Sequence, residues 1–170
     1  VTQEWVAIFN DTTMGSSSIA NAIAVDGSGN VYVTGTSGDF VTIKYNSSGI
    51  MQWLVRYDTT QDEASGIAID ASSNVYVSGY SSLTGSMGFA LIKFNSSGQR
   101  QWVRNYTTPG VAQDVTTGIA LDNSGNVFIT GYGFQLKDFI TLKYTPSGVQ
   151  EWINIYNGPA SNVDQAAAIQ

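Results

Sequence analysis

Residues 22–26 of the chain read Ala-Ile-Ala-Val-Asp, and this short stretch decides how the rest of the sequence is interpreted. It returns twice almost unchanged and once in part, as Gly66–Asp70, Gly118–Asp122 and Ala166–Gln170. Four tryptophans follow nearly the same period, at successive intervals of 48, 49 and 50 residues: Trp5, Trp53, Trp102 and Trp152. A repeat of this length indicates that the chain is built from several similar units.

Each unit contains four short segments with the features of β-strands. In the first unit these segments are Ile23–Asp26, Val31–Thr34, Phe40–Tyr45 and Gln52–Tyr57. Side chains alternate between two faces, β-branched and aromatic residues are frequent, and Gly, Asn and Ser occupy the turns. Both faces carry apolar residues, so each sheet must be covered on both sides, as the blades of a β-propeller are. We therefore expect an all-β fold, a β-propeller built of four-stranded antiparallel blades, with three full repeats and partial blades at both ends.

The expected array fills residues 1–170 as one domain, with units at about 22–57, 66–106 and 118–156 and lone strands at 3–9 and 166–170. Three units are fewer than the four to eight blades of a closed ring. Open blade edges and uncovered apolar faces favour association. The expected partner is therefore either the remainder of a longer propeller, of which this chain is a piece, or further copies of the chain in an oligomer or polymer.

Composition excludes several classes of function. The formal net charge of −6 repels nucleic acid. The chain has no Cys and no His, which removes thiol nucleophiles, Ser-His catalysis and the usual zinc, copper and haem ligands. No apolar run approaches the roughly 18 residues of a membrane helix, so membrane insertion is not expected. We expect no cofactor and no enzymatic activity.

Three motifs of the repeat resemble a known family. They are Asn30–Gly35 (Asn-Val-Tyr-Val-Thr-Gly), Ile43–Tyr45 (Ile-Lys-Tyr) and Gln52-Trp53. The sequence is similar in these motifs, over essentially its whole length, to the seven-bladed β-propeller repeat family called SBBP. The resemblance implies a secreted or surface-displayed protein of bacteria or archaea, a location outside the cell or on its surface, and no shared catalytic residues. Seven blades would require about four more than this chain holds.

Two segments look like the beginning of a calcium loop, Asp26–Asn30 and Asp122–Asn126. Alternate oxygen ligands suit a hard cation, but Val31 and Val127 stand where an EF-hand loop has glycine, and no acid follows at position twelve. A hairpin turn in which Asp and Asn bond local backbone groups explains the pattern better. We therefore expect no metal site.

Lysine and tryptophan each recur once per unit, which favours structural roles. A catalytic lysine would occur once in a site, whereas Lys44, Lys93 and Lys143 hold one repeat position. The tryptophans are expected to fill the wedge between blades rather than to stack on sugars. Asn46–Gly49 followed by Trp53 also resembles the tryptophan-docking repeat of quinoprotein dehydrogenases. A quinoprotein-like or lyase enzyme is therefore a weak alternative.

Connections at one end of the blades vary, while the turns at the other end are short and nearly constant. Variable loops on a rigid scaffold are typical of a binding surface. The candidate surface residues are Asp62, Glu63, Tyr80, Asp114, Phe134, Lys137 and Asp164. Four N-glycosylation sequons permit glycosylation, at Asn10, Asn46, Asn95 and Asn105; the turn positions Asn46 and Asn95 are the expected accessible sites.

Two functions follow as hypotheses. The first is a non-catalytic scaffold of a secreted or cell-surface protein that binds protein or glycan through the variable loops. The second is a structural subunit that self-assembles through open blade edges into a ring, sheath or extracellular filament.

Overall fold

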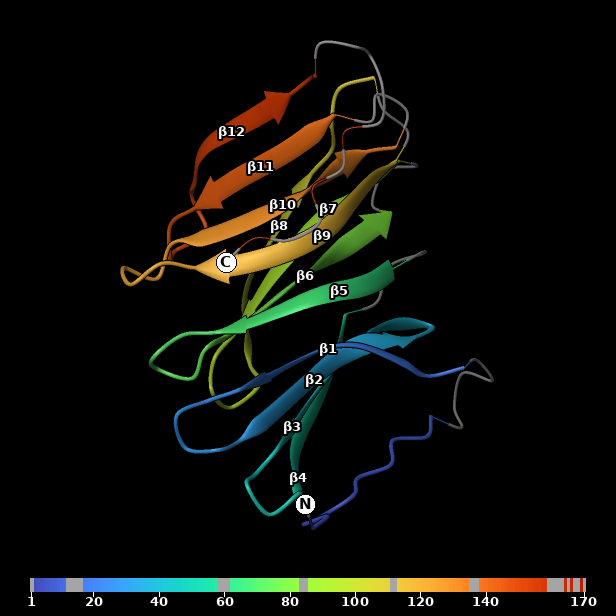
Figure 1. Cartoon of the computed structure of the whole chain (residues 1–170), viewed down its shortest axis with the longest axis vertical. Coiled ribbons are helices and arrows are strands. Elements are labelled where there is room, and N and C mark those ends of the chain that lie inside the picture. The colour runs from blue at the N-terminus through green and yellow to red at the C-terminus, as the bar shows by residue number, and fades with distance from the viewer. Residues whose placement is uncertain are drawn as a thin grey trace.

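The computed structural model describes residues 2–11, 17–57, 62–82, 86–110, 113–134, 138–158, 164, 166 and 169. Within them the structure is all-β, with three four-stranded antiparallel sheets stacked one on another (Figure 1). Blade 1 consists of β1 (Ile19–Val25), β2 (Val31–Ser37), β3 (Asp39–Tyr45) and β4 (Met51–Tyr57). Blade 2 consists of β5 (Asp62–Ile69), β6 (Val75–Ser82), β7 (Met87–Phe94) and β8 (Arg100–Tyr106). Blade 3 consists of β9 (Asp114–Leu121), β10 (Val127–Gly133), β11 (Phe139–Tyr144) and β12 (Gln150–Tyr156). The expected fold class is confirmed.

The first strand of each blade begins earlier than the sequence pattern predicts. The strands β1, β5 and β9 begin at Ile19, Asp62 and Asp114, whereas the predicted units begin at residues 22, 66 and 118. The register between the first and second strands shifts at this point in every blade, as between Ala64 and Gly66. Such a β-bulge moves the alternation of side chains by one residue, which hides the first half of the strand from a search for period two.

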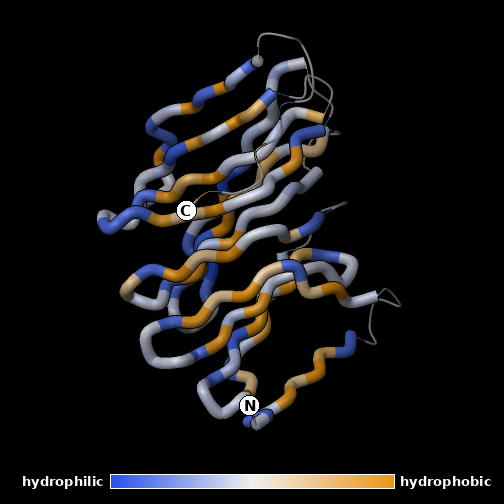
Figure 2. The backbone as a smooth tube through the Cα atoms, viewed as in Figure 1, coloured by the Kyte–Doolittle hydropathy of each residue, from blue (hydrophilic) through white to orange (hydrophobic). Residues whose placement is uncertain are grey.

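Most of the core lies between the blades. One buried cluster joins Tyr32, Phe40 and Tyr57 of blade 1 to residues of blade 2 such as Val77 and Ile92. A second joins blades 2 and 3 in the same way. The innermost strands β1, β5 and β9 contact one another in series, while β4, β8 and β12 form the outer edges. Figure 2 shows apolar residues along the strands and hydrophilic residues in many of the turns.

The predicted lone strands have different outcomes. Residues 2–11 follow an irregular path beside blade 1, and no hydrogen-bonded strand is assigned to them, so the strand expected at 3–9 is wrong (Figure 1). A β-strand requires a ladder of backbone hydrogen bonds to a neighbouring strand, and in the described part of the chain residues 2–11 are assigned none. Of the strand expected at 166–170, residues 167, 168 and 170 lie outside the described residues.

Candidate functional site: the end faces of the blade array

The contact between blades 1 and 2 is built around a tryptophan on a turn. The indole of Trp53 lies on the β7–β8 turn, where a Cβ at Gly98 would be 3.0 Å from the ring. Its Nε1 donates a hydrogen bond to the carbonyl of Ser96 at 3.1 Å. The ammonium of Lys44 lies 5.1 Å from the centre of the Tyr32 ring and 3.5 Å from the same carbonyl. Lys44 thus makes a cation–π contact within blade 1 and a hydrogen bond to blade 2.

Blades 2 and 3 repeat this contact. Trp102 lies on Gly148, and its Nε1 donates to the carbonyl of Pro146 at 3.3 Å. Lys93 lies 4.9 Å from the centre of the Tyr76 ring and donates to the same carbonyl at 3.1 Å. The repetition shows that the recurring Trp and Lys residues join neighbouring blades in both internal interfaces.

A phenylalanine and a glycine form the second element of each interface. The Phe40 ring of blade 1 lies directly over Gly79 of blade 2, and the Phe89 ring of blade 2 lies over Gly131 of blade 3. A Cβ at Gly131 would be only 2.8 Å from Cζ of Phe89, so a larger residue would push the blades apart. Glycine at this strand position therefore permits close stacking.

The outer face of blade 3 presents the same side chains with no blade described beyond it. Phe128 and Trp152 form the corresponding aromatic pair, with ring centres 6.1 Å apart, and Lys143 lies 5.6 Å from the Phe128 ring. The ammonium of Lys143 pairs with Glu151 at 2.7 Å. Trp152 is 41% exposed and Tyr156 is 54% exposed. We call this surface, carried by Phe128, Phe139, Lys143, Trp152 and Tyr156, the donor face.

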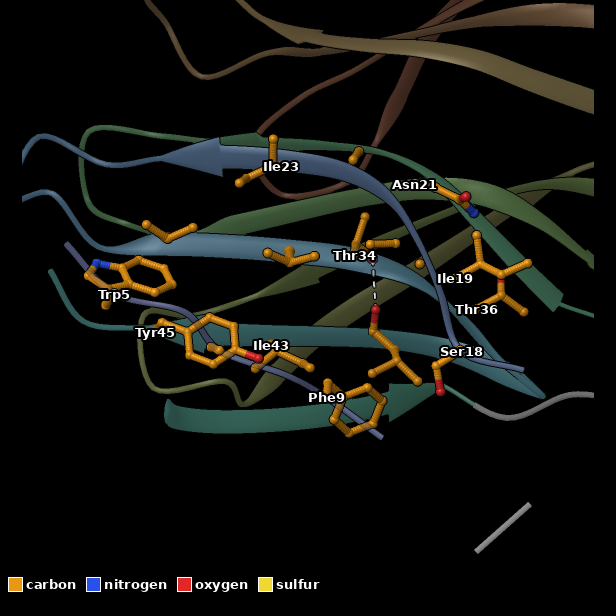
Figure 3. Close-up of a pocket in the computed structure, with 17 residues that line it drawn as sticks. Trp5, Phe9, Ser18, Ile19, Asn21, Ile23, Thr34, Thr36, Ile43 and Tyr45 are labelled. Atoms are coloured by element: carbon orange, nitrogen blue, oxygen red, sulfur yellow. Dashed lines mark hydrogen bonds between the residues drawn. The ribbon is translucent and has the colours of Figure 1, made fainter. Parts of the chain in front are cut away.

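The opposite end of the array is the exposed face of blade 1. Ile19, Ile23 and Val25 are 58%, 67% and 60% exposed. Ile19 and Ile23 border a groove of about 530 Å³, which Val33, Val41, Ile43 and Tyr45 also line (Figure 3). In blade 2 the equivalent residues Ile67 and Ile69 pack in the interblade core. We call this exposed surface the receiver face.

Residues 2–11 cover the outer side of the receiver face. The Trp5 ring lies 6.1 Å from the Tyr45 ring, and a Cβ at Gly49 would be 2.6 Å from the indole. Trp5 therefore occupies the position over Gly49 that Trp53 occupies over Gly98. Asp11 forms an ion pair with Arg56, which attaches the far end of the segment to blade 1. Figure 3 shows Trp5 and Phe9 on one side of the groove and Ile23 on another.

The C-terminal residues occupy the matching position on blade 3. The N–H of Gly158 donates to Asp164 at 2.6 Å, as the N–H of Thr108 donates to Asp114 at 2.7 Å. A Cβ at Gly118 would lie 3.2 Å from Ile169, as one at Gly66 would lie 2.9 Å from Ile119. Gly158, Asp164 and Ile169 each follow their counterparts Thr108, Asp114 and Ile119 by 50 residues. The repeat pattern aligned Ala166 with Gly118, at an interval of 48 residues. This predicted alignment of the C-terminal segment is therefore wrong by two residues.

The candidate surface residues are distributed unevenly. Asp62 and Asp114 are only 6% and 0% exposed, so their expected surface position is wrong. A buried carboxylate that accepts the Thr108 N–H shapes the connection into β9 rather than contacting a partner. Burial raises the pKa of Asp114. Asp164 is half-buried and accepts the Gly158 N–H in the same way.

Three other candidates remain accessible. Tyr80 and Glu63 are half-buried and hydrogen-bonded to each other at 2.8 Å. Burial, with the Glu63 carboxylate as the second cause, raises the pKa of Tyr80 to about 12. Phe134 is 56% exposed. Lys137 lies outside the described residues.

The sequons differ in exposure. Asn10 and Asn105 are exposed. Asn46 and Asn95 are half-buried, and each side-chain Oδ1 accepts two backbone N–H groups of its own turn. The turn positions are therefore less accessible than expected, because the carboxamides hold the turns.

The aspartates of the calcium-like segments are occupied by hairpin contacts. Asp26 Oδ1 accepts the N–H groups of Ser28 and Asn30, and Oδ2 accepts from the Asn30 amide and the Tyr32 hydroxyl. Burial alone would raise the pKa of Asp26, but these hydrogen bonds outweigh it and hold the pKa well below its usual value. Burial and the bond to Asp26 raise the pKa of Tyr32 to about 12. This geometry is that of the expected turn. In the part of the chain that the structure describes, no three Asp or Glu side chains gather where a metal ion could bind.

Within the described ranges, the end faces set blades 1 and 3 apart from blade 2. Among the strands that the structure describes, none pairs with the outer edge of β4, β8 or β12, so an open edge is not particular to the ends of the array. What blades 1 and 3 have, and blade 2 lacks, is an apolar face without another described blade against it. Within the described residues, no helix is long and apolar enough to cross a membrane.

Stacked four-stranded blades with repeated Trp and Gly contacts define the class as β-propeller repeat proteins. Residues 4–39 and 101–133 match the family model described as SBBP, Beta-propeller repeat, so these two segments resemble SBBP repeats. No curated protein matches the chain.

Two solved structures show the same fold. One is a protein of unknown function from Bacteroides caccae, with a TM-score of 0.52, 13% identity and 83% of this chain covered. The other is a eukaryotic initiation factor, with a TM-score of 0.60, 6% identity and 88% covered. The chain spans only 47% and 35% of the lengths of these two chains. At such low identities the likeness concerns the fold alone.

Proposed function

We propose that the chain is a non-catalytic scaffold segment of a β-propeller that acts outside the cell or on its surface. The stacked blades hold the variable connections at one end of the array, where protein or glycan partners bind. The observation that carries the proposal is that the side chains that recur in every repeat have structural roles. The repeated Asp and Asn residues stabilise the hairpin turns, and the repeated Lys and Trp residues join neighbouring blades. The array is therefore a rigid frame that supports the loops.

The loop end supplies accessible groups of the kind that partners contact. Phe134 is a largely exposed aromatic side chain in the connection that follows β10. Glu63 and Tyr80 form a hydrogen-bonded pair at the same end of blade 2. The short turns β1–β2, β5–β6 and β9–β10 lie at the opposite end (Figure 1). An exposed aromatic residue at the same end of the array as a fixed polar pair suits sugar stacking or a small protein contact.

Binding to immobilised glycans and to extracellular proteins tests this function. The substitution Phe134→Ser is expected to weaken binding by about tenfold or more, since an aromatic anchor commonly contributes more than 1 kcal/mol. The matched control is Ile50→Ser, which changes a 62% exposed residue next to the β3–β4 turn at the other end. If Phe134→Ser, Glu63→Gln and Tyr80→Phe all leave binding unchanged, the loop end is not the binding surface.

Cell fractionation of the source organism tests the proposed location. The protein should be found in the medium or in the surface fraction. Its recovery in the cytoplasmic fraction would contradict an extracellular scaffold.

The exposed end faces favour a second candidate function, a self-assembling structural subunit of a ring, sheath or filament. Large exposed apolar side chains at both ends of a stack mark surfaces that bind other chains. The mass of the chain in solution over a concentration series tests this candidate. A monomer at every concentration would contradict it.

A further inference from the structure

We infer that the donor face of blade 3 binds the receiver face of blade 1 in a second copy of the chain, and that residues 2–11 compete for this position. The inference rests on the second candidate function and specifies its interface. It involves the faces of the blades rather than their edges.

The first argument is continuity with the two interfaces inside the chain. Both use an aromatic residue on the second strand, a lysine on the third and a tryptophan on the fourth. The donor face keeps all three, as Phe128, Lys143 and Trp152. A partner that fits must therefore offer a β-turn with an accessible carbonyl and a glycine under the indole. Blade 1 offers such a turn at residues 46–49.

The second argument concerns the Phe–Gly contact. Phe40 lies over Gly79 and Phe89 over Gly131, which leaves Phe139 on blade 3 and Gly35 on blade 1 as the two remaining members of the series. Gly35 lines the groove, and the three atoms nearest to the position of its Cβ belong to the backbone of Ile19 and Ala20, whereas Gly79 and Gly131 each have a phenylalanine ring among theirs. Phe139 of a second copy has the residue type and strand position to fill this part of the groove.

The third argument is that residues near both termini occupy positions that a neighbouring blade fills at the internal interfaces. Trp5 lies over Gly49, where Trp152 of a second copy would lie. Ile169 lies beside Gly118, where Ile23 of a second copy would lie by analogy with Ile119 beside Gly66. Each terminal segment thus covers part of an end face with a single stretch of chain, while a blade would cover the face with four strands.

The N-terminal imitation is incomplete. Trp53 and Trp102 each donate to a turn carbonyl, and a lysine donates to the same oxygen. No hydrogen bond joins Trp5 to Ser47 within the residues that the structure describes, although Ser47 holds the position of Ser96 and Pro146. A second copy would add the tryptophan and lysine bonds and cover the groove, so residues 2–11 act as a displaceable strap.

The contact joins different faces of two identical chains, so it is head-to-tail. Repetition then gives a ring if the rotation closes and an open fibre if it does not. Each copy contributes one donor face and one receiver face, which makes the contact separable by mutation.

Sedimentation equilibrium of the full chain over a concentration series tests the inference. Trp152→Glu changes the donor face, Ile23→Glu changes the receiver face, and Val149→Glu is a control that places the same charge on a 59% exposed residue near the β11–β12 turn. Each face variant should be monomeric where the unmodified chain and the control associate. An equimolar mixture of the two face variants should form a one-to-one dimer and nothing larger, because one intact pair of faces remains.

The strap is tested by Trp5→Ala and independently by Asp11→Asn, which weakens the attachment to Arg56. Both should tighten association by about tenfold or more, since a competing contact has been removed. Circular dichroism establishes that each variant is folded. The inference is overturned if the unmodified chain and both strap variants are monomeric, if the mixed face variants do not dimerise, or if association persists in both single-face variants. Loop-dependent binding is measured on the same variants, so a failure of the scaffold proposal is distinguishable from a failure of stacking.

Discussion

Phe89 and Phe139 occupy the same position in successive blades, but only one of them is covered by a following blade. Phe89 is 1% exposed and lies over Gly131 of blade 3, whereas Phe139 is half-buried on the donor face. Each ring also contacts a tyrosine of its own blade, with ring centres 6.3 Å and 5.9 Å apart. Truncating each residue to alanine therefore isolates the contribution of interblade stacking.

The cost of Phe89→Ala has two parts. Removing the buried ring loses a transfer free energy of about 2 kcal/mol. The ring occupies about 100 Å³, and an enclosed cavity costs about 24 cal/mol per Å³, which adds about 2.4 kcal/mol. The expected loss of stability is about 4 kcal/mol. For Phe139→Ala the space opens to water and no closed cavity forms, so the expected loss is about 1 kcal/mol.

Urea unfolding followed by far-UV circular dichroism measures this difference, at a protein concentration where the chain is monomeric. With a slope of about 2 kcal/mol per molar urea, the two midpoints should differ by about 1.5 M. If Phe89→Ala is unfolded without urea, Phe89→Leu and Phe139→Leu give the same comparison at smaller cost. Equal losses in the two variants would refute the reasoning, because stacking on the next blade would then contribute nothing to the burial of Phe89.

Three further predictions concern the hairpin of residues 26–32. Gly29 has φ of +76°, and a Cβ there would meet Ser47 only at an ordinary contact distance of 3.5 Å, whereas a Cβ at Gly27 would meet nothing within 4 Å. Gly29→Ala should therefore cost about 1 kcal/mol in urea unfolding while Gly27→Ala costs close to nothing, and equal effects would exclude backbone conformation as the cause. Folding raises the pKa of Tyr32 from 10 to about 12, so the stabilising contribution of the protonated hydroxyl is complete below pH 10 and is lost as pH rises toward 12. Tyr32→Phe should flatten this alkaline decline of the melting temperature. The lowered pKa of Asp26 has the opposite effect, since the stabilising contribution of its carboxylate is present above the unfolded pKa of 3.8 and is lost as pH falls below that value. Asp26→Asn should therefore destabilise the protein at neutral pH and make its stability less sensitive to acid. An unchanged dependence of stability on acid pH would contradict the hydrogen-bond assignment.

Much of the candidate site could be predicted from local sequence. The Trp, Lys and Phe positions recur at a nearly constant interval, so one can expect them to share a role between blades. The Asp-Gly-Ser-Gly-Asn pattern at residues 26–30 identifies a hairpin, because the Asp bonds to backbone groups only two and four residues away. Interactions of such short range are encoded in the residues themselves.

The burial of Asp62 and Asp114 could not be predicted in this way. They precede a β-bulge, which interrupts the alternation of side chains and makes the start of β5 and β9 look like loop. The alignment of residues 166–170 with the earlier repeats could not be predicted either, because these five residues are rich in alanine and align equally well at two offsets. Contacts of Asp164 and Ile169 with residues that are not their sequence neighbours decide it.

The sequence by itself determined the strands, the tight turns and the repeat, because alternation with period two and turn chemistry act between residues a few positions apart. Only the tertiary structure decided which faces are covered. Ile67 and Ile23 hold the same place in their repeats, yet one is packed against a neighbouring blade and the other is 67% exposed. Burial depends on what lies opposite a side chain in space, and the local pattern of residues carries no information about that.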